Sequence, residues 1–155
     1  ITFLSDIVDR LLDLRMYYDE YRPILLKVSP DLSHEQLDEI IDYCLRSGID
    51  GIVAGNTTRS RDGITSISKE KIEEIGNGGM SGAPVHKKNL ELVRYVHTKS
   101  EGKLPIIGVG GIMSPEQAKD MLNAGASLVE IYSGFIYEGP SLVKRILIYL
   151  EQTVK

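Results

Sequence analysis

The sequence predicts an α/β protein in which a leading helix is followed by four strand–helix units on a parallel sheet. Short, nearly continuous apolar segments alternate with segments whose apolar residues recur at helical spacing, as buried parallel strands and their covering helices require. Glycine turns follow the last two apolar segments, as they often do in barrels. Four units are half of a (β/α)8 barrel of typically about 250 residues, and a small doubly wound sheet is the alternative.

Length and composition limit the classes of protein that fit. The 155 residues, 42% apolar and 26% charged, form one partial domain over residues 1–155. A net charge of −4 argues against a nucleic-acid or anionic-membrane surface. The single Cys44 excludes an internal disulfide and fits the cytoplasm. No apolar run approaches the roughly 20 residues of a membrane span. Because Ile1 is not an initiator methionine, we expect the chain to begin inside a larger protein.

Residues 1–22 are predicted to form the leading helix, capped by Ser5 or Asp6 and ended by Arg22-Pro23. Residues 23–155 hold the four units. The first strand is the apolar run 24–28, and the next helix starts at Ser33, where Gln36 completes a capping box, and stops at Gly48. The expected inward stripe of that helix is Leu37, Ile40, Ile41, Cys44 and Leu45.

The second strand, residues 51–54, leads into an unusually long loop. Residues 59–84 contain five glycines, Gly63 among them, and one short helix near 69–75, and loops of this length commonly bind ligands or act as lids. The remaining elements alternate regularly. They are helix 87–98, strand 104–109, helix 115–123, strand 128–132 and helix 140–153.

The most informative segment is residues 106–112 (IIGVGGI), where an apolar strand meets a glycine turn and Ser114-Pro115 opens a helix. Backbone N–H groups at such a turn approach a phosphate closely, and a helix N-terminus adds roughly half a positive charge. Residues 131–134 (IYSG) repeat this arrangement, so both strand ends are expected to hold one phosphate. The turn is not a dinucleotide fingerprint, because position 113 is methionine.

Lys27 is an anomaly, because an ammonium in an apolar strand is costly unless it faces water or a ligand. It either snorkels from the strand end or stabilises negative charge on a ligand. Asn56, Thr57 and Thr58 after the second strand suit an imide or a carboxylate, although these residue types also favour ordinary turns. The histidines lack metal spacing, so we expect no metal site, and no Ser-His-acid set is evident.

Taken together, five motifs in order resemble the class 2, quinone-dependent dihydroorotate dehydrogenases, over nearly the whole chain from about Tyr21. The likeness concerns the C-terminal half of that family's FMN-binding (β/α)8 barrel, and so favours the barrel. The motifs are residues 26–33 (LKVSPDLS), 56–59 (NTTR), 79–84 (GMSGAP), 108–112 (GVGGI) and 131–135 (IYSGF).

The resemblance implies a role for each matching residue. Lys27 corresponds to a contact with the flavin near N1 and O2, where negative charge grows on reduction. Asn56 and Thr57 correspond to residues that hold dihydroorotate or orotate. The implied FMN contacts, which include the phosphate cradle of the last four, are Lys27, Gly55, Gly82, Gly110, Gly111, Tyr132 and Ser133.

The implied activity is the oxidation of dihydroorotate to orotate in pyrimidine biosynthesis, with quinone reoxidising the flavin at the cytoplasmic membrane. The family's catalytic serine base has no counterpart here, so the 155 residues alone are expected to be inactive and to associate with the missing half-barrel or with themselves. Smaller departures are Met80, where leucine is usual, and Gly55, where threonine is common. A phosphate-binding module without catalysis, or another FMN-dependent barrel oxidoreductase, are the alternatives.

Overall fold

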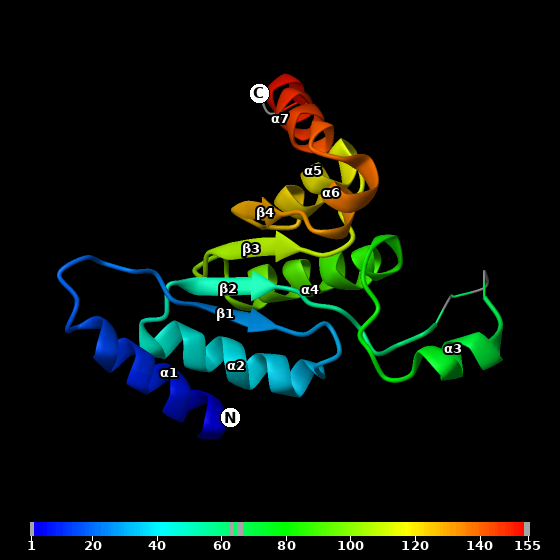
Figure 1. Ribbon diagram of the computed structural model, residues 1–155. Coiled ribbons are helices and arrows are strands. Elements are labelled where there is room, and N and C mark those ends of the chain that lie inside the picture. The colour runs from blue at the N-terminus through cyan, green and yellow to red at the C-terminus, as the bar shows by residue number, and fades with distance from the viewer. Residues whose placement is uncertain (1, 63, 65–66, 154–155) are drawn as a thin grey trace.

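The computed structural model describes residues 2–62, 64 and 67–153, so Gly63 of the long loop lies outside the described residues. Its four strands form a parallel sheet whose spatial order equals the chain order, with a helical crossover between neighbours (Figure 1). This agrees with the predicted α/β class of four strand–helix units. The strands are β1 (Leu25–Val28), β2 (Gly51–Ala54), β3 (Ile106–Val109) and β4 (Leu128–Glu130).

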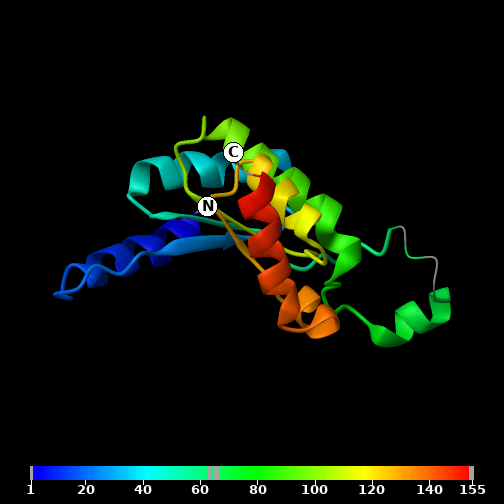
Figure 2. The same cartoon turned by 90° about the horizontal axis from the view of Figure 1, so that it is seen from above.

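The helices lie mainly along one face of this sheet, and the carboxyl ends of the strands meet at the opposite edge from α1 (Figures 1 and 2). α3 projects away from the sheet on the long loop that follows β2 (Figure 1). None of the helices within the described residues is long and apolar enough to cross a membrane. The helices are α1 (Thr2–Arg15), α2 (His34–Ser47), α3 (Lys69–Ile75), the 3-10 turn η1 (Ala83–Val85), α4 (His86–Lys99), α5 (Pro115–Asn123), α6 (Ser133–Glu138) and α7 (Ser141–Thr153).

Strand side chains alternate between a covered and an uncovered face. Ile52 and Ile106 are neighbours across β2 and β3 and are fully buried beneath the helices. On the other face, Lys27 and Glu130 are exposed, and Leu128 is 62% exposed. A parallel sheet normally has both faces covered, so this half-covered sheet is what one side of a barrel presents.

α2 forms as its sequence predicts. Ser33 Oγ accepts the Gln36 N–H at 3.3 Å, and Gln36 Oε1 accepts the Ser33 N–H at 3.0 Å, which completes the capping box. Gly48 ends the helix in the left-handed conformation, with φ of 78°. Cys44 is buried in the core as expected, whereas Leu45 is 41% exposed, so its assignment to the inner stripe was wrong.

The leading helix differs from its prediction at both ends. It begins at Thr2, and Ser5 is inside it, where its hydroxyl donates to the Thr2 carbonyl instead of capping. It stops at Arg15 rather than reaching residue 22, and the chain leaves through tight turns. Val8 is the one buried residue of this helix, so few apolar side chains attach the helix to the core. The exposed apolar positions are Phe3, Ile7, Leu11 and Leu14.

The last unit contains a helix that the sequence pattern did not reveal. β4 ends at Glu130 instead of Tyr132, and α6 occupies Ser133–Glu138 before α7 begins at Ser141. A helix of six residues is too short for its apolar periodicity to show. In this helix Gly134 packs so closely against the Ile112 carbonyl that any side chain at position 134 would overlap that oxygen.

The long loop is tied down where it leaves and rejoins the sheet. Thr58 and Met80 form an antiparallel bridge, with N–H···O distances of 3.1 and 2.8 Å. The Arg61 guanidinium donates to the Thr58 carbonyl at 3.3 Å and to the carbonyls of Gly76 and Gly78. The excursion that carries α3 is therefore closed at its base, and residues 79–82 lie next to the end of β2.

Candidate functional site: a pocket at the carboxyl ends of the strands

A pocket of about 410 Å³ opens at the carboxyl ends of the four strands. The structure brings all nine site residues predicted from the sequence to this one pocket. Five further residues also line it: Ser81, Val85, Val109, Glu130 and Ile131. The nine predicted residues are Lys27, Gly55, Asn56, Thr57, Gly82, Gly110, Gly111, Tyr132 and Ser133.

The glycine turn after β3 provides the closest approach of backbone to the pocket. Gly110 and Gly111 have φ of 114° and 72°, which disfavour residues with side chains. A Cβ on Gly111 would lie 2.7 Å from the Gly82 carbonyl oxygen and from His86 Cβ. Within the described part of the chain, the N–H groups of Gly111 and Ile112 donate to no protein acceptor. The N–H group of Gly111, a residue that lines the pocket, is thus a free donor among the described residues at a place where a side chain does not fit.

The start of α6 supplies the second half of this cradle. Tyr132 precedes the helix, and its carbonyl accepts the N–H groups of Phe135 and Ile136. The N–H groups of Ser133 and Gly134 lie at the helix N-terminus, where backbone donors have no intrahelical partner. Ser133 also lines the pocket and lies 3.7 Å from where a Gly82 Cβ would be. Backbone donors from two turns therefore converge, as an anionic group requires.

Lys27 places a cation on the same pocket from β1. Its Cα is paired with Val53 across the sheet, so the side chain leaves the uncovered face rather than entering the core. Among the described residues, no carboxylate lies within ion-pair distance of the Lys27 ammonium. The position explains why an apolar strand tolerates a lysine, since the ammonium is not buried.

Asn56 and Thr57 leave β2 at the pocket rim, and both are exposed. Asn56 Oδ1 accepts the Thr57 N–H at 2.9 Å, so part of the ordinary turn interpretation holds. The Asn56 amide NH2 has no acceptor among the described residues. The Thr57 side chain fills the space that a side chain on Gly79 would need. The loop of residues 79–82 is consequently packed directly onto the Asn56–Thr57 segment.

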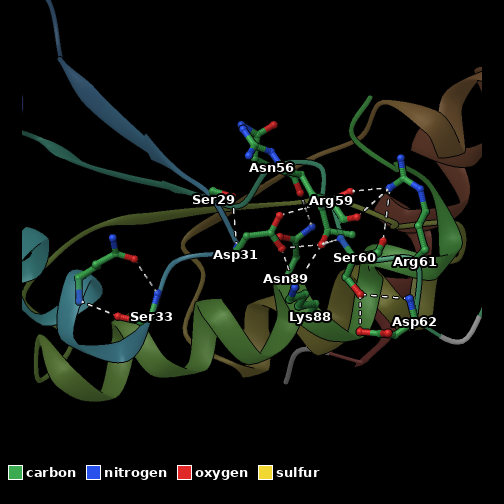
Figure 3. A network of polar contacts seen from close by, with 12 residues as sticks. Ser29, Asp31, Ser33, Asn56, Arg59, Ser60, Arg61, Asp62, Lys88 and Asn89 are labelled. Atoms are coloured by element: carbon green, nitrogen blue, oxygen red, sulfur yellow. Dashed lines mark hydrogen bonds and ion pairs between the residues drawn. The ribbon is translucent and has the colours of Figure 1, made fainter. Parts of the chain in front are cut away.

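A network of hydrogen bonds and one ion pair, centred on Asp31, holds the residues that follow Asn56 and Thr57 (Figure 3). Asp31 accepts hydrogen bonds from Thr58 Oγ1 at 2.5 Å, from Lys88 Nζ at 2.6 Å and from the Arg59 N–H at 2.7 Å. Partial burial alone would raise the pKa of Asp31, but the hydrogen bonds from Lys88, Thr58 and Arg59 outweigh it and lower the pKa to about 2. The carboxylate joins the loops after β1 and β2 to α4.

Two polar residues of α4, the half-buried His86 and the buried Asn89, lie behind the pocket and were not predicted from the sequence. Burial lowers the pKa of His86, although the Gly110 carbonyl opposes the shift, and its Nδ1 atom is buried without a partner among the described residues. Asn89 is fully buried and donates to the Asn56 carbonyl at 3.0 Å. The available signal was the position of Asn89, one turn before the buried Leu92 and Val93 on the inner face of the helix.

The residues present fit a phosphorylated, flat cofactor. The glycine cradle, which a Cβ would fill, offers backbone donors that lack protein acceptors, as a phosphate needs. Gly55 and Gly82 line the pocket between that cradle and Lys27, and a Cβ on Gly82 would meet only Ser133, at 3.7 Å, so the backbone leaves room for a ring system there. No cluster of three or more His, Cys, Asp or Glu side chains gathers within the described residues.

Comparison with known proteins places this site in a family. The sequence model described as dihydroorotate dehydrogenase matches residues 5–154. Dihydroorotate dehydrogenase (quinone) of Proteus mirabilis is 42% identical over 144 residues, which are 93% of this chain and 42% of that protein. The enzyme of the same name from Christiangramia forsetii is 46% identical over 143 residues, 92% of this chain and 41% of the relative. The chain spans about two fifths of the length of these curated relatives.

Solved structures agree with the sequence matches. The ligand-free type of DHODH from Eimeria tenella superposes with a TM-score of 0.82 and 29% identity, over 96% of this chain and 45% of that one. The DHODH of Eimeria tenella in complex with ferulenol has a TM-score of 0.77 and 32% identity, over 86% of this chain and 35% of that one. The fold is thus confirmed as four units of the (β/α)8 barrel of these proteins, and the chain belongs to the dihydroorotate dehydrogenase family.

Proposed function

We propose that these residues form the FMN-binding half of a dihydroorotate dehydrogenase that oxidises dihydroorotate to orotate, in pyrimidine biosynthesis, with a quinone as electron acceptor. The observation that carries the proposal is the convergence of two backbone turns and one lysine on a single pocket. Residues from all four strand ends contribute to it, as is usual for active sites at the carboxyl-terminal face of barrels. Membership of the family supports the choice of flavin over other phosphorylated ligands.

In this proposal the chain binds both ends of the cofactor, the phosphate and the flavin ring. The backbone turn of Gly110 and Gly111, together with the N–H groups at the start of α6, holds the FMN phosphate, and Tyr132 and Ser133 shape that cradle. Gly55 contacts the ring through its backbone, and Gly82 leaves space beside the ring. When bound, the flavin accepts a hydride from the substrate. Lys27 contributes a positive charge where the ring becomes negative, because a fixed cation stabilises developing charge without reorganisation.

Asn56 and Thr57 are proposed to hold the substrate. The free NH2 group of Asn56 suits a carbonyl or carboxylate oxygen, and the Thr57 hydroxyl can donate or accept. The resemblance implies no base for the substrate C5 proton among the residues that line this pocket, and we assign that role to none of them, Ser81, Ser133 and Glu130 included. We therefore propose that the 155 residues by themselves do not turn over, that a serine base from other residues completes the site, and that the complete enzyme is peripheral on the cytoplasmic membrane.

The experiment that tests the proposal is a titration of the chain with FMN, followed by quenching of flavin fluorescence. We expect saturable binding of FMN. Riboflavin, which lacks the phosphate, should bind more weakly than FMN, and so should unrelated sugar phosphates. Gly111→Asp should weaken FMN binding at least about 100-fold, because its side chain would overlap the Gly82 carbonyl and His86, displace the turn and add a negative charge beside the phosphate donors. Lys27→Ala should weaken it less.

Gly78→Asp is the matched control, since it adds the same charge where a side chain meets nothing within 4 Å and the backbone is not left-handed. It should bind FMN like the unaltered chain. Equal affinity for FMN and sugar phosphates would instead support a phosphate-binding module without catalysis. The coding sequence upstream separates the enzymes: an Asn-rich motif with a serine supports quinone-dependent dihydroorotate oxidation, whereas a cysteine base at that place indicates class 1A.

A further inference from the structure

Asn89 is a polar residue on the buried face of α4, a position at which helices normally have an apolar side chain. It is 0% exposed, and the next two inward residues of α4, Leu92 and Val93, are buried apolar side chains. Buried polar groups are tolerated when hydrogen bonds compensate for lost water. Asn89 makes one such bond, from Nδ2 to the Asn56 carbonyl, and its Oδ1 has no partner among the described residues.

The Asn89 carboxamide lies between two glycines that line the pocket. A Cβ built on Gly55 would overlap Asn89 Oδ1, and a Cβ built on Gly110 would overlap Asn89 Nδ2. Gly55 closes β2 and Gly110 follows β3, so one side chain packs against both turns at once. The two turns are also joined directly, because the Gly55 N–H donates to the Val109 carbonyl at 3.1 Å.

We propose that Asn89 is a positioning residue of the pocket: its carboxamide is the spacer that sets the Asn56–Thr57 rim at a fixed place relative to the Gly110–Gly111 cradle. Figure 3 shows Asn89 rising from α4 toward Asn56, beside the separate Asp31 and Lys88 contacts. Asn89 does not line the pocket itself, so it acts through the two loops. The inference rests on the proposed function for the identity of the ligand, while the coupling of the loops is independent of it.

This assignment accounts for the glycine at position 55. Asn89 and any side chain at position 55 compete for one volume, so the amide and the glycine form a matched pair. An alanine at position 55 should therefore be harmful when asparagine occupies position 89 and much less harmful when alanine does. That reciprocal relationship tests whether the two residues share one volume, and the exchange measurement below distinguishes a spacer from a residue that only fills the core.

The first measurement is amide hydrogen exchange at Gly55, Thr57 and Thr58 in the unaltered chain and in Asn89→Ala. Val93→Ala is the matched control, because it removes a fully buried side chain from the next turn of the same helix. We expect Asn89→Ala to speed exchange of these amides about tenfold more than Val93→Ala does, with equal effects of both changes on amides of the turn at residues 100–103. The same exchange pattern in both variants would overturn the proposal.

The second measurement is a double-mutant cycle on FMN affinity, made where all variants are folded. Asn89→Ala should weaken binding about tenfold, the size expected from one lost hydrogen bond. Gly55→Ala should weaken binding at least as much alone, yet should cost less than about threefold in the Asn89→Ala background. Independent, additive effects would contradict the spacer role. If the unaltered chain binds no FMN, the proposed function fails, and the exchange comparison alone decides the role of Asn89.

Discussion

Asp31 and Thr58, 27 residues apart in the chain, are joined by a hydrogen bond of 2.5 Å from the Thr58 hydroxyl to the Asp31 carboxylate. Asp31 follows β1, whereas Thr58 follows β2 and is only 2% exposed. Because Lys88 donates to both side chains, α4 takes part in the same contact. The loop that carries Asn56 and Thr57 is therefore held in place from a neighbouring strand and from a helix, which preorganises the rim of the pocket.

Asp31→Asn should lower the free energy of unfolding at pH 7 by about 1–2 kcal/mol, since it weakens three hydrogen bonds to a partly exposed charge. The folded pKa of about 2 lies below the ordinary 3.8, so the stabilisation is complete above about pH 4 and is lost as the pH falls toward 2. Urea unfolding of both proteins at pH 7 and pH 3 measures this. Asp19→Asn, at an exposed position, is the control, and an equal effect of both substitutions would refute the prediction.

His86 should make the protein less stable in mild acid. Burial lowers its folded pKa below the usual 6.5, so the unfolded chain takes up a proton more readily and stability falls as the pH drops below 6.5. His86→Gln should remove part of the difference in unfolding free energy between pH 7.5 and pH 5.5. A proton NMR titration of the His86 ring gives the midpoint directly, and a midpoint at or above 6.5 would contradict the expectation.

Cys44 should be almost unreactive in the folded protein. Its side chain is 2% exposed, and burial raises the pKa of its thiol to about 11, so the reactive thiolate is scarce and shielded. Reaction with a chromogenic disulfide reagent at pH 8 should be at least about 100-fold slower in buffer than in 6 M urea, because it requires local opening. Comparable rates in the two solutions would mean that the packing of α2 onto the core does not shield the thiol.

The uncovered sheet face should drive self-association of the 155-residue chain. Within the described residues, β4 pairs only with β3, and Leu128 of β4, on the uncovered face of the sheet, is 62% exposed. Open sheet edges and exposed apolar residues favour contact with another chain. We expect concentration-dependent sedimentation that Leu128→Lys reduces and that Ile75→Lys, at a similarly exposed site on α3, leaves unchanged. A single monomeric species at high concentration would exclude the prediction.

The sequence by itself determined the order of the four strands, the buried Cys44, the capping box at Ser33 and nine of the residues that line the pocket. These follow from local information: periodicity, caps, glycine turns and the motifs at the strand ends. Because the carboxyl ends of parallel strands meet at one edge, residues at four strand ends could be expected to converge without knowledge of their distances.

Only the tertiary structure decided which of the remaining polar residues support that pocket. The exposure of Leu45, the end of α1 at Arg15 and the helix after Tyr132 depend on contacts with distant residues that no local pattern contains. The same holds for Asn89, which reads in sequence as an ordinary helix residue. Its position between two glycines arises when α4 packs beneath β2 and β3, and packing of separate elements in space is what a linear sequence pattern does not encode.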